Sequence, residues 1–164
     1  MKPNRTAVTK RTMATAATVV VARKPLKVPS RTRSFLPLLD RVNVVKQVQL
    51  GFPVAAIETL SEALHLTQQS LLRIAHIAPA TLARRRTHPD ERLSPAESDR
   101  IYRIAATCDL ALRLFEGDAT AARRWLNEPA KALGGLLPLE HLATEAGAAQ
   151  VRDLIGRLES SVYA

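Results

Sequence analysis

The side chains that could support covalent or metal chemistry are four histidines and a single cysteine. The histidines are His65, His76, His88 and His141. They are scattered along the chain and do not recur at the spacing of metal ligands. Cys108 falls on a predicted apolar helix stripe, where we expect a small buried side chain rather than a nucleophile. Glu140 and His141 are adjacent in a predicted helix, so they face different sides and form no acid–base pair.

The sequence motifs of common enzyme classes are missing as well. The chain has no glycine-rich phosphate loop, no HExxH zinc motif, no CxxC pair and no nucleophilic serine elbow. A lone cysteine allows no internal disulfide and favours a reducing compartment. No apolar run is long enough to span a bilayer. We therefore expect a protein that is not an enzyme, uses no cofactor and no metal, and does not enter a membrane.

The net charge of +9 is concentrated at the N-terminal end. Residues 1–46 contain eleven Lys and Arg residues and one acidic residue, a balance of +10, whereas the rest of the chain balances at −1. Residues 1–39 show no sustained helical stripe, so we expect a largely disordered basic tail. Such a tail can bind DNA phosphates, can be merely solubilising, or can be an organelle transit peptide. Its apolar patch, residues 35–39, could dock on the body or seed a dimer contact.

Three consecutive arginines at 84–86 are the cations best placed for specific binding. They end a predicted helix, 79–86, that follows another short helix, 68–75, which Thr67 can cap. Two short helices with inward Leu residues and a tight turn between them are typical of a helix-turn-helix. Its second helix would enter the DNA major groove. The residues expected to contact DNA are Gln68, Gln69, Ala80, Thr81, Arg84, Arg85 and Arg86.

A simpler interpretation of the arginines stays open. They could be a solvated helix end whose charges complement the helix dipole. The whole chain could also be a nonspecific basic nucleic-acid binder that depends on its tail. The pattern is therefore compatible with three interpretations: specific DNA binding by a helix-turn-helix, a solvated helix end, and nonspecific binding of nucleic acid.

The elements that position these residues are predicted to be helices. Hydrophobic residues make up 46% of the chain but aromatic residues only 4%, which favours an aliphatic, all-α core. Residues 42–50 could form a strand or a helical turn, and Pro53 is expected to begin a helix. Ser94-Pro95-Ala96-Glu97 is a capping box at the start of the longest helix, whose apolar face continues until Gly117.

The C-terminal part of the chain begins with a short helix and a turn. Asp118 can cap the helix, which is expected to end at Trp125-Leu126 because Pro129 cannot continue it. Gly134-Gly135 then provide a turn. The side chains expected to build the core of this part are Trp125, Leu133, Leu139, Leu142 and Leu154.

Two more helices are predicted after this turn. Pro138 can begin a helix that runs to about Ala146 and ends at Gly147. The last helix has an apolar stripe made of Val151, Leu154, Ile155 and Leu158. Arg152, Arg157 and Glu159 belong to its polar side, and we expect an exposed tip at Tyr163.

This C-terminal pattern resembles the toxin-binding domain of the Xre/MbcA/ParS antitoxin family, and most of all the Xre antitoxins of RES–Xre toxin–antitoxin pairs. The matching residues are Trp125-Leu126, Pro129, Leu133-Gly134-Gly135, Pro138, Thr144-Glu145-Ala146-Gly147-Ala148, Val151, Leu154, Arg157 and Val162-Tyr163-Ala164. The resemblance covers roughly residues 48–164. The chain departs from it at Ser161, where the family usually has Gly.

The resemblance implies a cytoplasmic antitoxin that neutralises a RES-domain, NAD-degrading toxin by occluding its active site and that represses its own operon through operator DNA. The expected toxin-binding residues are Arg152, Arg157, Glu159, Tyr163 and Ala164. The alternative is a helix-turn-helix transcription regulator that has no toxin partner and whose C-terminal domain dimerises or binds another protein.

The expected architecture has three parts. A basic tail, 1–39, precedes a helix-turn-helix domain, 40–93, and a linking helix with a small helical toxin-binding domain, 94–164. We expect a homodimer, because one helix-turn-helix contacts few base pairs and a second copy doubles the recognised site.

Overall fold

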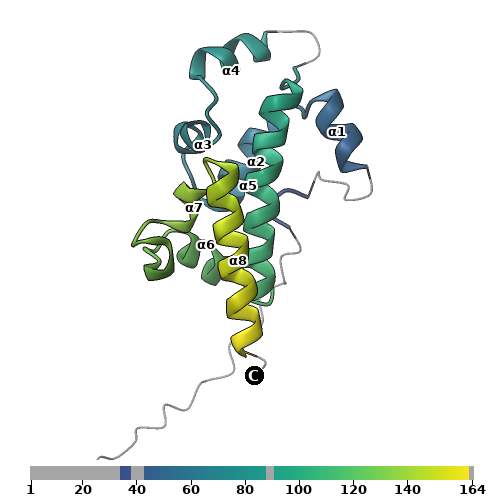
Figure 1. Ribbon diagram of the computed structural model, residues 1–164. Coiled ribbons are helices and arrows are strands. Elements are labelled where there is room, and N and C mark those ends of the chain that lie inside the picture. The colour runs from purple at the N-terminus through teal and green to yellow at the C-terminus, as the bar shows by residue number, and fades with distance from the viewer. Residues whose placement is uncertain (1–33, 38–42, 88–90, 163–164) are drawn as a thin grey trace, which may run out of the picture.

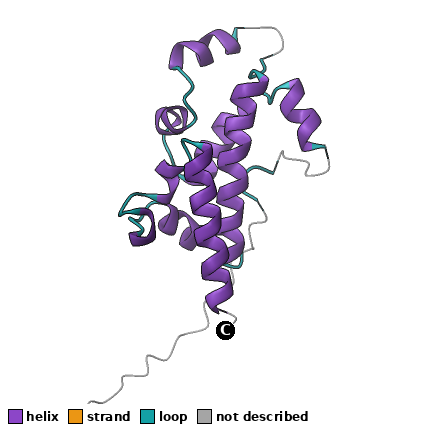
Figure 2. Cartoon of the chain, in the orientation of Figure 1, coloured by secondary structure: helices purple, strands orange, loops and turns teal. Residues whose placement is uncertain are grey.

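The computed structural model describes residues 34–37, 43–87 and 91–162, and their regular secondary structure is helical apart from two isolated β-bridges (Figures 1 and 2). The helices are α1 Val44–Leu50, α2 Ala55–Leu64, α3 Gln68–Ile74, α4 Pro79–Arg86, α5 Pro95–Leu114, α6 Ala119–Leu126, the 3-10 helix η1 Lys131–Leu133, α7 Pro138–His141 and α8 Glu145–Val162. The predicted all-α fold is confirmed. None of these helices has both the length and the apolar character needed to cross a bilayer.

The first two helices answer the question that the sequence left open. Residues 44–50 form a helix and not a strand. Helix α2 begins at Ala55, two residues later than expected, because Pro53 pairs with Arg92 in a β-bridge. The bridge is held by Val54 N–H, which donates to the Glu91 carbonyl at 2.8 Å.

Helix α5 is the longest described helix, and several other helices pack against it. It begins at the predicted capping box. The Ser94 hydroxyl accepts from the Glu97 N–H at 3.3 Å, and the Glu97 carboxylate accepts from the Ser94 N–H at 2.6 Å. The helix packs lengthwise against α8 and also contacts α1 and α6 (Figure 1). Its buried side chains include Ile101, Ile104, Ala105, Cys108 and Leu112. They belong to one hydrophobic cluster that includes residues from α2 to α8.

The predicted boundary at Gly147 is wrong. Helix α7 ends at His141, and Gly147 lies in the first turn of α8 instead of closing the helix before it. A Cβ on Gly147 would lie 2.1 Å from the His141 carbonyl oxygen. Glycine is needed here because the end of α7 packs directly on the backbone of α8, not because a helix stops.

Residues 34–37 dock on the body. Phe35 and Leu36 are each 1% exposed. The Asp109 carboxylate on α5 accepts from the Ser34 hydroxyl at 2.6 Å and from the Phe35 N–H at 2.7 Å. The sequence left open whether the patch 35–39 docks on the body or forms a dimer contact. Its described residues Phe35 and Leu36 dock on the body. The remainder of the predicted tail lies outside the described residues.

Candidate functional site

The predicted helix-turn-helix is present as α3 and α4. The Thr67 hydroxyl caps α3 by accepting from the Ser70 N–H at 3.1 Å. Leu71, Leu72 and Leu82 are buried, as their inward assignment required. Leu82 is the buried residue of α4, and this helix stands at the edge of the molecule (Figure 1). Most of its surface is therefore open to a ligand.

The residues predicted to contact DNA differ in exposure. Gln69, Ala80, Arg84 and Arg86 are exposed, and Gln68, Thr81 and Arg85 are half-buried. The Arg85 Nε lies 3.4 Å from a carboxylate oxygen of Glu97, and Arg86 pairs with Glu58. Within the described ranges no carboxylate pairs with Arg84. Of the three arginines, Arg84 is thus the one whose charge is available.

Glu97, in the first turn of α5, forms an ion pair with Arg85 of α4. Burial alone raises the pKa of its carboxyl group. The hydrogen bonds with Ser94 and the nearby charges of Arg85 and Arg100 outweigh burial, so the pKa falls below its usual value of 4.5. Glu97 therefore stays charged at neutral pH and holds Arg85 against the helix start.

The C-terminal half has the core that the sequence predicted. Leu133, Leu139, Leu142 and Leu154 are buried. Trp125 is partly buried, with its ring centroid 6.3 Å from that of Phe115. The Asp118 carboxylate caps α6 by accepting from the N–H groups of residues 120 and 121. These contacts fix α6, η1 and α7 beside α8.

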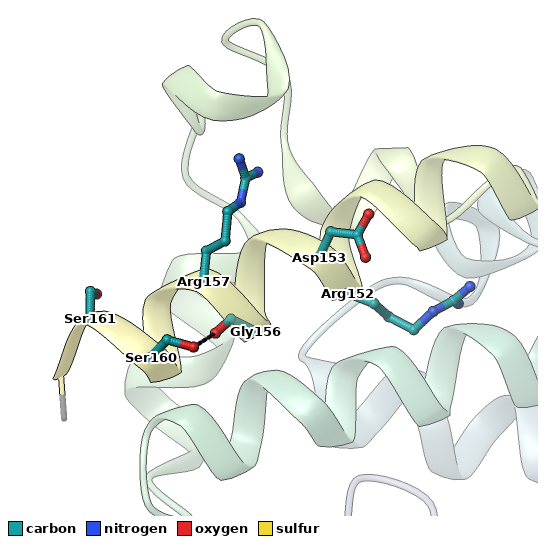
Figure 3. Close-up of a pocket in the computed structure, with 6 residues that line it drawn as sticks. All are labelled: Arg152, Asp153, Gly156, Arg157, Ser160 and Ser161. Carbon is teal, nitrogen blue, oxygen red and sulfur yellow. Dashed lines mark hydrogen bonds between the residues drawn. The ribbon is translucent and has the colours of Figure 1, made fainter. Parts of the chain in front are cut away.

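The polar residues predicted on the last helix are separated in the structure. Arg152 donates to the Glu145 carboxylate at 2.5 Å, whereas Arg157 is exposed and has no ion pair with any described residue. The two side chains point in different directions (Figure 3). Glu159 is half-buried, and Tyr163 and Ala164 lie outside the described residues. Arg152 and Arg157 therefore do not form a joint fork.

Two adjoining hollows border the outer face of α8. The first has a volume of about 960 Å³ and is lined by Arg152, Asp153, Gly156, Arg157, Ser160 and Ser161 (Figure 3). The second, about 490 Å³, lies between α8 and the segment from η1 to α7, and its lining includes Leu136, His141, Gln150, Asp153 and Arg157. Leu136, Asp153 and Gly156 were not among the residues predicted to bind a toxin. The available signal was a glycine on the polar side of a strongly amphipathic helix.

The metal-ligating side chains of the described residues form no cluster, and the nucleophilic thiol of Cys108 is buried. Among the described residues, no three His, Cys, Asp or Glu side chains are grouped so that they could hold a metal. Cys108 is fully buried; burial, together with the neighbouring Asp109 charge, raises the pKa of its thiol far above the usual value. The predicted role of Cys108 as a small core residue is confirmed.

Three arginine side chains form contacts between helices that are far apart in the sequence. Arg73 on α3 pairs with Glu140 on α7 at 3.0 Å. Arg123 on α6 donates to the Ala63 carbonyl at 2.9 Å, and Arg103 on α5 donates to the Ala143 carbonyl at 3.2 Å. These contacts tie α3 to α7, α6 to α2, and α5 to the segment between α7 and α8.

Two family models match successive parts of this chain. Residues 44–106 match the antitoxin Xre-like helix-turn-helix domain, and residues 110–160 match the antitoxin Xre/MbcA/ParS C-terminal toxin-binding domain. A protein named Antitoxin Xre from Yersinia enterocolitica is 40% identical over 128 residues, which cover 78% of this chain and 86% of the relative.

Two further relatives have related names. Antitoxin Xre from Photorhabdus laumondii is 34% identical over 112 residues, covering 68% of this chain and 75% of the relative. A protein named Prs ADP-ribosylating antitoxin from a Sphingobium species is 26% identical over 134 residues, covering 77% of this chain and 82% of the relative.

Proposed function

This chain belongs to the Xre/MbcA/ParS antitoxin family, and from that premise we propose that it neutralises a RES-domain, NAD-degrading toxin by placing the end of α8 in the toxin's active site. The chain is an antitoxin and not an enzyme. Its helix-turn-helix domain is followed by a domain that binds a toxin. The identity of the toxin, the blocking mechanism and the cytoplasm as the place of action are the proposed parts.

The observation that best supports this proposal is the exposed guanidinium of Arg157, which is unpaired among the described residues. Its guanidinium is exposed and lacks an ion-pair partner among the described residues, whereas Arg152 is already held by Glu145. A free guanidinium is a planar donor that can bind a carboxylate or a phosphate through two hydrogen bonds. Arg157 is one turn from Ser161, close to the end of α8, so the helix end and this cation can enter a cleft together.

Growth rescue tests this mechanism. A chain that lacks residues 159–164 should fail to protect cells that express the toxin, because the helix end is gone, while its far-ultraviolet circular dichroism stays helical. Arg157→Ala should weaken protection. The matched control is Arg113→Ala, which removes an exposed arginine from α5 and should protect like the wild type. Full protection by the shortened chain would refute the blocking role of this end.

We also propose that the helix-turn-helix binds operator DNA in the promoter of the chain's own operon, as a homodimer in the cytoplasm. The support is the exposure of α4 and the available charge of Arg84. One such helix reads only a few base pairs, so a second copy is needed for specificity.

Titration of promoter DNA at several salt concentrations tests this second role. Arg84→Ala should weaken binding roughly tenfold, and the slope of log affinity against log salt should fall by about 1 if Arg84 contacts a phosphate. Arg113→Ala is again the control. Removal of residues 1–33 should leave the preference for the operator intact. Loss of all binding on this removal would instead favour a nonspecific basic binder.

A further inference from the structure

Helix α8 contains two interior glycines, Gly147 and Gly156. Contacts among the described residues explain why a glycine is needed only at Gly147. Gly147 is required by the His141 carbonyl, which a Cβ would approach to 2.1 Å. Gly156 is exposed, and apart from its chain neighbours and the nearby backbone of its own helix, a Cβ built on it would meet no described atom within 4 Å. Glycine destabilises an exposed helix interior relative to alanine. Internal packing therefore does not account for glycine at position 156.

The backbone around Gly156 is open to another molecule. Gly156 lies in the larger hollow with Asp153, Arg157 and Ser160 (Figure 3). The Ser160 hydroxyl donates to the Gly156 carbonyl at 2.9 Å, so this side chain turns back onto its own helix. A segment of a partner protein can then approach the helix backbone at Gly156 more closely than a side chain would allow.

The smaller hollow adds an apolar contact to the same face. Asp153 and Arg157 line both hollows, so the two adjoin at these residues. Leu136 lines the smaller one and is 54% exposed. Its backbone is fixed, because its carbonyl accepts from the Ala130 N–H at 3.1 Å. An exposed leucine on a held loop is a ready contact for an apolar group.

We propose that Leu136, Asp153, Gly156 and Arg157 form a toxin-docking face beyond the helix end, and that a toxin segment packs directly on the backbone of α8 at Gly156. The occupant is the toxin because the matched toxin-binding domain, residues 110–160, contains the whole face. The toxin segment places an apolar side chain against Leu136 and a carboxylate near Arg157. This inference rests on the proposed function and extends it from the helix end to the side of α8.

The test compares the affinities of variants for the catalytically inactivated toxin encoded next to this chain. Gly156→Ala should raise the melting temperature but weaken toxin binding, and Gly156→Gln should weaken it roughly 100-fold because the longer side chain holds the partner away. Ala96→Gln enlarges an exposed position on α5 and is the matched control, with unchanged affinity expected.

Leu136→Ser gives a second measurement that does not depend on α8 remaining intact, and it should weaken binding about tenfold. If the wild-type chain does not bind the toxin, the proposed function fails and this inference fails with it. If the wild type binds and both Gly156→Gln and Leu136→Ser stay within about twofold of it, the docking face is wrong while the proposed function stands.

Discussion

Asp109 on α5 ties the N-terminal segment to the long helix. Its carboxylate is 6% exposed and accepts hydrogen bonds from the Ser34 hydroxyl and the Phe35 N–H. The Phe35 N–H is 74 residues away in sequence, and both Phe35 and Leu36 are buried beside it. A buried amide needs such an acceptor, so the position of this segment depends on one carboxylate.

Asp109→Ala should destabilise the fold by about 1–3 kcal/mol, since it leaves the Phe35 N–H without this acceptor. Urea unfolding measures the loss. Asp99→Ala removes an exposed carboxylate from the same helix and should change stability by no more than about 0.5 kcal/mol. Equal effects of the two substitutions would contradict a special role for Asp109.

Glu97 makes stability depend on pH in a defined direction. Its pKa is lower in the folded chain than its usual 4.5, so its contribution is fully present above about pH 4.5 and is lost as the pH falls through the folded-state value. Glu97→Gln cannot titrate, so the gap in urea midpoint between wild type and variant should narrow on acidification. A constant gap for Glu97→Gln would refute the assignment.

At the scale of elements, the starts of α3, α5 and α6 were predictable because their signals are local. The capping box at Ser94 and the caps at Thr67 and Asp118 each join residues no more than three apart. The end of α7 was not predictable, because Gly147 serves a contact between two helices that the pattern of one helix cannot show. The pattern allowed residues 35–39 to dock on the body, but it could not identify Asp109 as the acceptor, because the two lie 74 residues apart in the sequence.

Gly147→Ala and Gly156→Ala should have opposite effects, although they are the same substitution in one helix. The first forces a Cβ to within 2.1 Å of the His141 carbonyl oxygen and should cost about 1–3 kcal/mol. The second meets open space and should add about 0.5–1 kcal/mol through helix propensity. Thermal unfolding of both variants measures this. A gain for Gly147→Ala would show that α7 does not pack on α8 as described.

At the scale of the molecule, one hydrophobic cluster and three arginine contacts join the helix-turn-helix domain, residues 44–106, to the C-terminal domain, residues 110–160. The C-terminal pattern was enough to predict the family, whereas the toxin-binding residues on α8 stay a prediction. It could not show that Leu136, which precedes α7, lines a hollow together with Asp153 and Arg157 of α8, because that contact depends on tertiary packing.

The most direct test of the blocking mechanism is to titrate the purified toxin with the antitoxin while following NAD consumption. The full chain should bring the activity to background near stoichiometric addition. A chain ending at Leu158 should leave most of the activity even when added in excess, because it lacks the helix end. Equal inhibition by the two chains, or a toxin that stays active with the full chain in excess, would contradict the account.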